Sequence, residues 1–139
     1  MKRFFSFAVV IVALTTLSLL SCGMNVRAQE SSSLGVESAT ICRDVVAREP
    51  VDAGTLFPAS VAKLYCFTKI VNIQGPNQVT HVWYHGDTER ARVSLAVNSP
   101  SWRTYSSKAI QPHETGVWYV DVLGPDGGRL ASLTFEVTR

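Results

Sequence analysis

Hydrophobic and polar residues alternate along most of the chain after residue 38, and a period of two is typical of β-strands. Leu133, Phe135 and Val137 recur at every second position near the C-terminus. No window carries a long helical stripe. Seven segments rich in Val, Ile, Thr, Tyr or Trp are predicted to be strands: Ala39–Val46, Ala62–Val71, Gln78–Tyr84, Arg90–Val97, Trp102–Ile110, Gly116–Val122 and Arg129–Thr138.

Turn-forming residues separate these segments. His85-Gly86-Asp87 has the composition of a hairpin turn, and Gly124–Gly128 joins a proline to an Asp-Gly pair. Seven short strands in about 100 residues are typical of a single antiparallel β-sandwich of immunoglobulin-like form. A small β-barrel is the alternative. We therefore expect one all-β domain over residues 39–139, preceded by a flexible tether over residues 29–38.

The predicted strand over residues 62–71 is apolar on both faces, with Tyr65, Phe67 and Val71 on one face and Leu64, Cys66 and Ile70 on the other. Such a strand is expected to lie in the centre of its sheet. Cys42 could then face Cys66 from a neighbouring strand, and an even pair of cysteines in an exported protein predicts a disulfide. The alternative is two buried thiols.

The N-terminus has the pattern of an export signal. Lys2 and Arg3 precede an uncharged apolar run from Phe4 to Leu20, which small and polar residues follow. We predict a signal peptide over residues 1–28. The alternative is a lipoprotein signal over residues 1–21, in which Cys22 would be lipidated. An uncleaved anchor is a further alternative, and the expected location is the periplasm.

Removal of residues 1–28 changes the charge of the protein. That segment holds three basic residues and no acidic one, which leaves ten Lys and Arg against eleven Asp and Glu, a net charge of −1. No basic patch or familiar motif then indicates binding to nucleic acid.

Two segments concentrate aromatic residues beside cations: residues 80–85 and residues 101–108. If exposed, such residues could bind sugars or peptides, because Trp and Tyr offer a flat apolar face and Arg or Lys can bind a carboxylate or stack on a ring. The alternative is that Trp83, Trp102 and Trp118 are core residues. The candidate contact residues are His81, Tyr84, Trp102, Arg103, Tyr105 and Lys108.

We predict neither a metal nor a cofactor. His81 and His85 are four residues apart, which on a strand is about 13 Å and too far to share one ion. No nucleophile elbow or phosphate-binding loop occurs. Glu114 and Asp121 are the carboxylates that a glycan-acting enzyme would need at a suitable separation.

Six short sequences occur in order between Cys42 and Val137: Arg48–Val51, Phe57–Ser60, Lys63–Thr68, His81–Tyr84, Trp102–Lys108 and Gly116–Trp118. Together they resemble the uncharacterised bacterial family known as domain of unknown function 2914. The resemblance implies a small all-β envelope module and supplies no catalytic residue.

Three hypotheses for function follow. The first is a non-catalytic periplasmic module that binds a protein or a glycan partner. The second is a structural envelope protein that associates with itself through an edge strand. The third is a glycan-acting enzyme.

Overall fold

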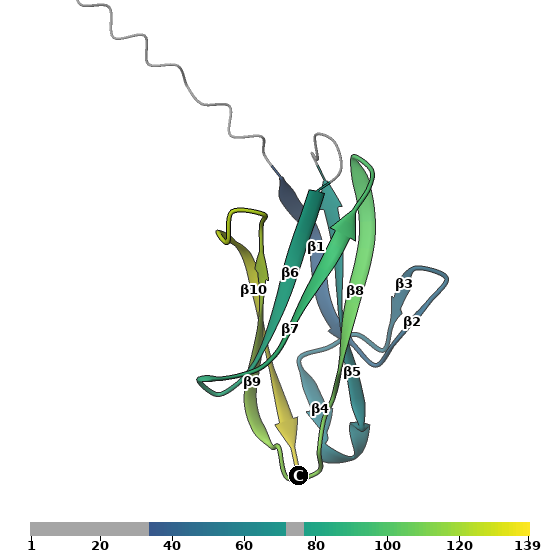
Figure 1. Ribbon diagram of the computed structural model, residues 1–139. Helices are drawn as coiled ribbons and strands as arrows, with labels where there is room; N and C mark the ends of the chain where they lie inside the picture. The colour runs from purple at the N-terminus through teal and green to yellow at the C-terminus, as the bar shows by residue number, and fades with distance from the viewer. Residues whose placement is uncertain (1–33, 72–76) are drawn as a thin grey trace, which may run out of the picture.

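The computed structural model describes residues 34–71 and 77–139, which form ten β-strands and one 3-10 turn (Figure 1). The predicted signal peptide, its cleavage sites and Cys22 lie outside these residues. Within the described ranges, no helix is long and apolar enough to cross a membrane. The elements are β1 (Gly35–Cys42), β2 (Asp44–Val46), β3 (Glu49–Val51), β4 (Leu56–Pro58), η1 (Ala59–Val61), β5 (Lys63–Val71), β6 (Asn77–His85), β7 (Thr88–Val97), β8 (Ser101–Ala109), β9 (Gly116–Leu123) and β10 (Arg129–Thr138).

The strands form a sandwich, as the alternation predicts. One sheet has the order β1-β5-β8, the other has the order β4-β10-β9-β6-β7, and β2 and β3 form a separate hairpin. The sheets stay open and separate, so the barrel alternative is wrong. The sandwich is not wholly antiparallel, because β4 pairs with β10 in parallel. The immunoglobulin-like form stays a prediction.

The core lies between the two sheets and follows the predicted period of two. Trp118, Val120 and Val122 of β9 are fully buried, and Phe135 of β10 packs on the Trp118 ring. Trp83 is fully buried as well. Trp83 and Trp118 are therefore core residues, as the alternative interpretation of the aromatic segments predicted. Burial of each large side chain contributes roughly 1.5–3 kcal/mol, so this alternation is the main source of stability.

Strand β5 is central in its sheet, as its two apolar faces predict. It pairs with β1 on one side and with β8 on the other. Leu64, Cys66 and Ile70 are fully buried toward the other sheet. Phe67 points to the outer face and is nonetheless buried.

The predicted disulfide between Cys42 and Cys66 is wrong: both are buried free thiols. They lie on neighbouring strands, but Cys42 is opposite Tyr65 and Cys66 is opposite Ile41. This offset of one residue sends the two side chains to opposite faces of the sheet. Burial raises the pKa of the Cys66 thiol far above its usual range, so the thiol stays protonated.

Several boundaries differ from the prediction. The predicted tether overlaps β1, where Glu37 forms an ion pair with Lys69 at 2.6 Å. The predicted strand over residues 39–46 is interrupted at Arg43, after which the chain enters the β2–β3 hairpin. Strands β3 and β4 were not predicted, because each has only three residues and contains a proline. The turn at Gly86 and Asp87 lies where the sequence places it.

Candidate binding surface

His81, a predicted contact residue, is instead part of a buried polar network between the sheets. Its Nδ1 atom lies 2.7 Å from Ser106 Oγ, and its Nε2 atom lies 3.2 Å from Thr68 Oγ1. Trp83 Nε1 donates to Ser106 Oγ at 3.0 Å, and Thr68 Oγ1 donates to the carbonyl of Thr104 at 3.1 Å. His81 faces inward because it shares the inner face of β6 with Trp83.

One neutral tautomer satisfies this whole network. If Ser106 O–H donates to His81 Nδ1, then His81 Nε2–H donates to Thr68, whose own proton goes to the carbonyl of Thr104. A second proton on the imidazole would be buried without a counter-charge, and burial accordingly lowers the pKa of His81 to about 4. The network ties β5, β6 and β8 together across the core. It is inaccessible to a partner.

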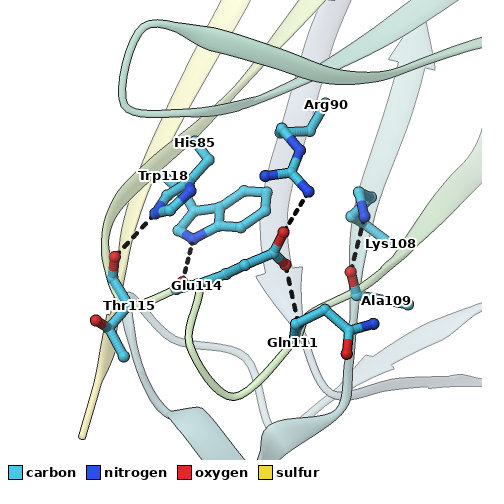
Figure 2. Close-up of polar contacts among 8 residues, drawn as sticks. All are labelled: His85, Arg90, Lys108, Ala109, Gln111, Glu114, Thr115 and Trp118. Atoms are coloured by element: carbon cyan, nitrogen blue, oxygen red, sulfur yellow. Dashed lines mark hydrogen bonds and ion pairs between the residues drawn. The ribbon is translucent and has the colours of Figure 1, made fainter.

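A second polar assembly closes the loop between β8 and β9 (Figure 2). The Glu114 carboxylate is buried, pairs with the Arg90 guanidinium, and accepts the Gln111 N–H at 2.9 Å. Although burial opposes ionisation, this N–H bond and the Arg90 charge hold the pKa of Glu114 below its usual range. Trp118 Nε1 donates to the carbonyl of Glu114 at 2.9 Å. Every polar group of Glu114 is thus engaged within the protein.

Two further residues, His85 and Lys108, lie beside this assembly. His85 stacks on Trp118 with ring centroids 4.6 Å apart, and its Nε2 atom lies 2.8 Å from the carbonyl of Thr115. Lys108 donates to the carbonyl of Ala109 at 2.8 Å and lies near Glu114 (Figure 2). We therefore assign Lys108 to this end of the sandwich rather than to the surface that Arg103 and Tyr105 form.

Glu114 and Asp121 do not form a pair of carboxylates. Asp121 alternates with the buried Val120 and Val122, so it points to the outer face of the five-stranded sheet. Glu114 points into the protein toward Arg90. The arrangement that a glycan-acting enzyme would require is absent at these two positions.

The outer face of the three-stranded sheet carries aromatic rings and cations together. Tyr65 of β5 and Tyr105 of β8 are opposed edge to face, with ring centroids 5.9 Å apart. Lys63 Nζ lies over the Tyr65 ring at 5.3 Å from its centroid. Tyr105 is 46% exposed. Arg103 lies two residues before Tyr105 and therefore on the same face.

The β2–β3 hairpin extends beside this face, and Figure 1 shows it standing away from the sheets next to β8. Two contacts hold it there. Glu49 pairs with Arg103 at 2.7 Å, and the Arg48 guanidinium lies 5.8 Å from the centroid of the Trp102 ring. The other side of Trp102 packs on the apolar cluster around Ile70. We call Arg48, Glu49, Lys63, Tyr65, Arg103 and Tyr105 the aromatic–cationic surface. Trp102 borders this surface, because its position next to Arg103 on β8 turns its side chain to the inner face, toward Ile70.

The turn of this hairpin holds two non-glycine residues in the left-handed region. Ala47 and Arg48 have φ angles of 51° and 59°. A two-residue hairpin turn of this hand matches the twist of its strands, and Asn or Gly normally fill it. Ala47 therefore retains a local strain of roughly 1 kcal/mol.

Replacing Ala47 with asparagine is expected to stabilise the protein, because asparagine tolerates the left-handed conformation better than alanine. The gain should be about 0.5–1 kcal/mol, or roughly 3–5 °C in the thermal midpoint of a domain of this size. Thermal unfolding of Ala47→Asn beside the wild-type chain measures it. A midpoint that is unchanged or lower would contradict a strained turn.

The six predicted contact residues thus separate into five groups. Arg103 and Tyr105 lie on the aromatic–cationic surface. Trp102 faces inward toward Ile70 and borders that surface only through its contact with Arg48. His81 is in the core, so its prediction as a contact residue is wrong. Lys108 belongs to the Glu114 assembly. Tyr84 lies on the opposite side of the sandwich, where it stacks on Tyr119 with ring centroids 4.5 Å apart.

Four residues of this surface were not among the predicted contact residues: Arg48, Glu49, Lys63 and Tyr65. Tyr65 could have been found, because the alternation already placed it on the face opposite Leu64. Arg48 could not, since only the hairpin brings it near Trp102. In the described part of the chain, no group of three or more His, Cys, Asp or Glu side chains could hold a metal ion.

Comparison with known proteins agrees with the resemblance seen in the sequence. The family described as Protein of unknown function (DUF2914) matches residues 76–137, and the predicted family is confirmed over that range. The range includes β6 to β10 but not the β2–β3 hairpin or β5, so three of the six quoted segments lie outside it. No curated protein matches the chain.

Proposed function

We propose that this chain is an exported, non-catalytic interaction module of the periplasm, which binds a protein or glycan partner through its aromatic–cationic surface. One observation carries the proposal. The exposed Tyr105 ring and its partner Tyr65 lie on the same outer face as two cations, Lys63 and the ion-paired Arg103. The buried polar side chains of His81 and Glu114 are engaged by internal partners, so neither is free to contact a ligand.

Two features of this surface favour binding. Tyr residues give large contact areas at a low cost in side-chain entropy, and they recur in binding sites of many kinds. The hairpin also exposes Val46, at 54%, and Val51. These exposed apolar residues lie on the hairpin beside the paired tyrosines, where they could add apolar contact to an extended chain or a sugar ring.

The test is capture from an envelope extract with the tagged chain and two matched double variants. Arg103→Ala/Tyr105→Ala removes an ion-paired arginine and a paired tyrosine from the surface. Arg92→Ala/Tyr84→Ala removes an equivalent pair, bound to Glu89 and stacked on Tyr119, from the opposite sheet. We expect the first variant to lose the captured partner and the second to retain it.

Both variants must first match the wild-type thermal midpoint to within a few degrees. A partner retained by all three proteins, or lost only with the second variant, would contradict the assignment of this surface. Capture of further copies of the chain itself would support the structural hypothesis instead.

A further inference from the structure

The four tyrosines of the chain form two pairs of different geometry. Tyr84 of β6 and Tyr119 of β9 are directly opposite each other in the register of the five-stranded sheet. Their rings are stacked, with centroids 4.5 Å apart and an angle of 11° between the ring planes. Tyr65 and Tyr105 meet instead at 65°, with centroids 5.9 Å apart. Only the first pair therefore places one ring flat against the other.

The stacked pair is arranged for oxidative coupling. Tyr84 and Tyr119 are both partly exposed, so a diffusible oxidant can reach them. A phenol that loses an electron and a proton becomes a radical, whose unpaired electron is concentrated on the oxygen and on ring carbons that include the two beside the C–O bond. Directly opposite residues on paired strands hold their side chains in contact. Two radicals held in this way combine without first diffusing together, which is the advantage of a fixed geometry.

The other pair is less well arranged for this reaction. Tyr65 and Tyr105 are opposed edge to face, so their reactive carbons are not held along one shared ring face. Lys63 Nζ also lies 5.3 Å from the centroid of the Tyr65 ring. A positive charge so close opposes the removal of an electron from that ring. The chain thus contains its own comparison for the stacked pair.

We propose that Tyr84 and Tyr119 form an oxidative cross-linking site, at which a peroxidase acting with hydrogen peroxide couples the two rings into dityrosine. Each phenol loses one electron and one proton, and a carbon–carbon bond forms between the two rings, beside the C–O bond of each. The hydrogen on each of these carbons then leaves as a proton and a phenol O–H is restored. The two electrons and two protons released overall reduce hydrogen peroxide to two water molecules.

The link would fasten β6 to β9 by a covalent bond. Cys42 and Cys66 cannot supply such a bond, because they are free thiols on opposite faces of their sheet. A bond between Tyr84 and Tyr119 closes a loop of about 35 residues, which lowers the entropy of the unfolded chain as a disulfide does. We expect the cross-linked protein to unfold at least about 5 °C above the untreated protein.

The test is oxidation of the dilute chain with peroxidase and hydrogen peroxide, followed by tryptic digestion and mass spectrometry. Trypsin leaves each tyrosine in a different peptide: residues 64–69, 70–90, 104–108 and 109–129. We expect the monomer to lose two hydrogen atoms and to show dityrosine fluorescence. The linked product should join the peptide that contains Tyr84 to the peptide that contains Tyr119.

Four single variants identify the rings that react. Tyr84→Phe and Tyr119→Phe should each abolish the linked product and the thermal shift. Tyr65→Phe and Tyr105→Phe should leave both unchanged. Phenylalanine keeps the ring and removes only the hydroxyl group, and the thermal midpoint of each variant before oxidation verifies that it is folded.

Three results would overturn the proposal: an unchanged yield in Tyr84→Phe, an equal yield of the link between Tyr65 and Tyr105, and a link found only between two chains. Absence of any link would overturn it as well, provided that N-acetyltyrosine amide is coupled under the same conditions. The site is independent of the aromatic–cationic surface, so its failure leaves the proposed function standing.

Discussion

Lowering the pH from 7 to 4 is expected to reduce the free energy of unfolding by about 3 kcal/mol through His81 alone. The neutral imidazole is buried among Thr68, Trp83 and Ser106, and burial lowers its pKa to about 4. An unfolded chain returns the histidine to its ordinary pKa near 6.5. A difference of about 2.5 pKa units corresponds to roughly 3 kcal/mol.

The sign follows from which state binds the proton. Between pH 6.5 and 4 the unfolded chain takes up a proton that the folded protein excludes, so stability falls as the pH falls. Stability from this source is fully present above pH 6.5, and its loss is complete below about pH 4. Glu114 has a lowered pKa, so its contribution is present above its unfolded pKa and is lost only at lower pH.

Urea unfolding of the wild-type chain and of His81→Gln at several pH values tests this expectation. Glutamine can accept from Ser106 and donate to Thr68 but does not titrate, so the variant should lose most of the slope between pH 6.5 and 4.5. Its stability at pH 7 is expected to be lower than that of the wild type. Parallel profiles for the two proteins would show that His81 is not the residue responsible.

The second large effect is expected for Glu114→Ala, which should lower the free energy of unfolding by about 2–3 kcal/mol at pH 7. The substitution leaves the Gln111 N–H and the Arg90 guanidinium without their acceptor. Arg90 is partly exposed and can recover some hydration, which keeps the loss below that of a fully buried pair. The loop that positions Trp118 would loosen as well.

Glu136→Ala is the matched control, because Glu136 is exposed and forms no ion pair within the described ranges. Its effect should be within about 0.5 kcal/mol. Unfolding in urea, followed by tryptophan fluorescence, measures all three proteins. Equal effects of the two substitutions would mean that the contacts of Glu114 do not stabilise the fold.

The fold was largely predictable because burial and hydrogen bonding act locally along a strand. The alternation at Trp118, Val120 and Val122 identifies a buried face without any knowledge of the partner sheet. The same rule places β5 in the centre of its sheet. Strand β4 was beyond reach, because its three residues become a strand only through parallel pairing with the distant end of β10.

The wrong predictions for the disulfide and for His81 have one cause. The register between two strands cannot be deduced from the sequence of either strand alone. Cys42 and Cys66 lie on paired strands, yet an offset of one residue puts them on opposite faces. His81 looked like a contact residue because histidine is usually polar and exposed, but its position in register with Trp83 turns it inward. Its partners Thr68 and Ser106 come from strands of the other sheet.

The candidate site was half predictable for the same reason. Arg103 and Tyr105 are two residues apart, so their place on one face is visible before folding. Trp102, next to Arg103, turns to the opposite face, toward Ile70. Tyr65 and Arg48 join Arg103 and Tyr105 only through strand pairing and the hairpin. Lys108 is three residues beyond Tyr105, and that odd spacing on a strand directs it to the opposite face.

The most direct test of the account is a hydroxyl-radical footprint of the captured complex against the chain alone. If the aromatic–cationic surface is the contact, Tyr105, Tyr65 and Val46 should become protected, while Leu56 and Val117 on the opposite sheet keep their reactivity. Protection confined to Leu56, Val117 and Tyr119, or no change at Tyr105, would contradict the proposed binding surface.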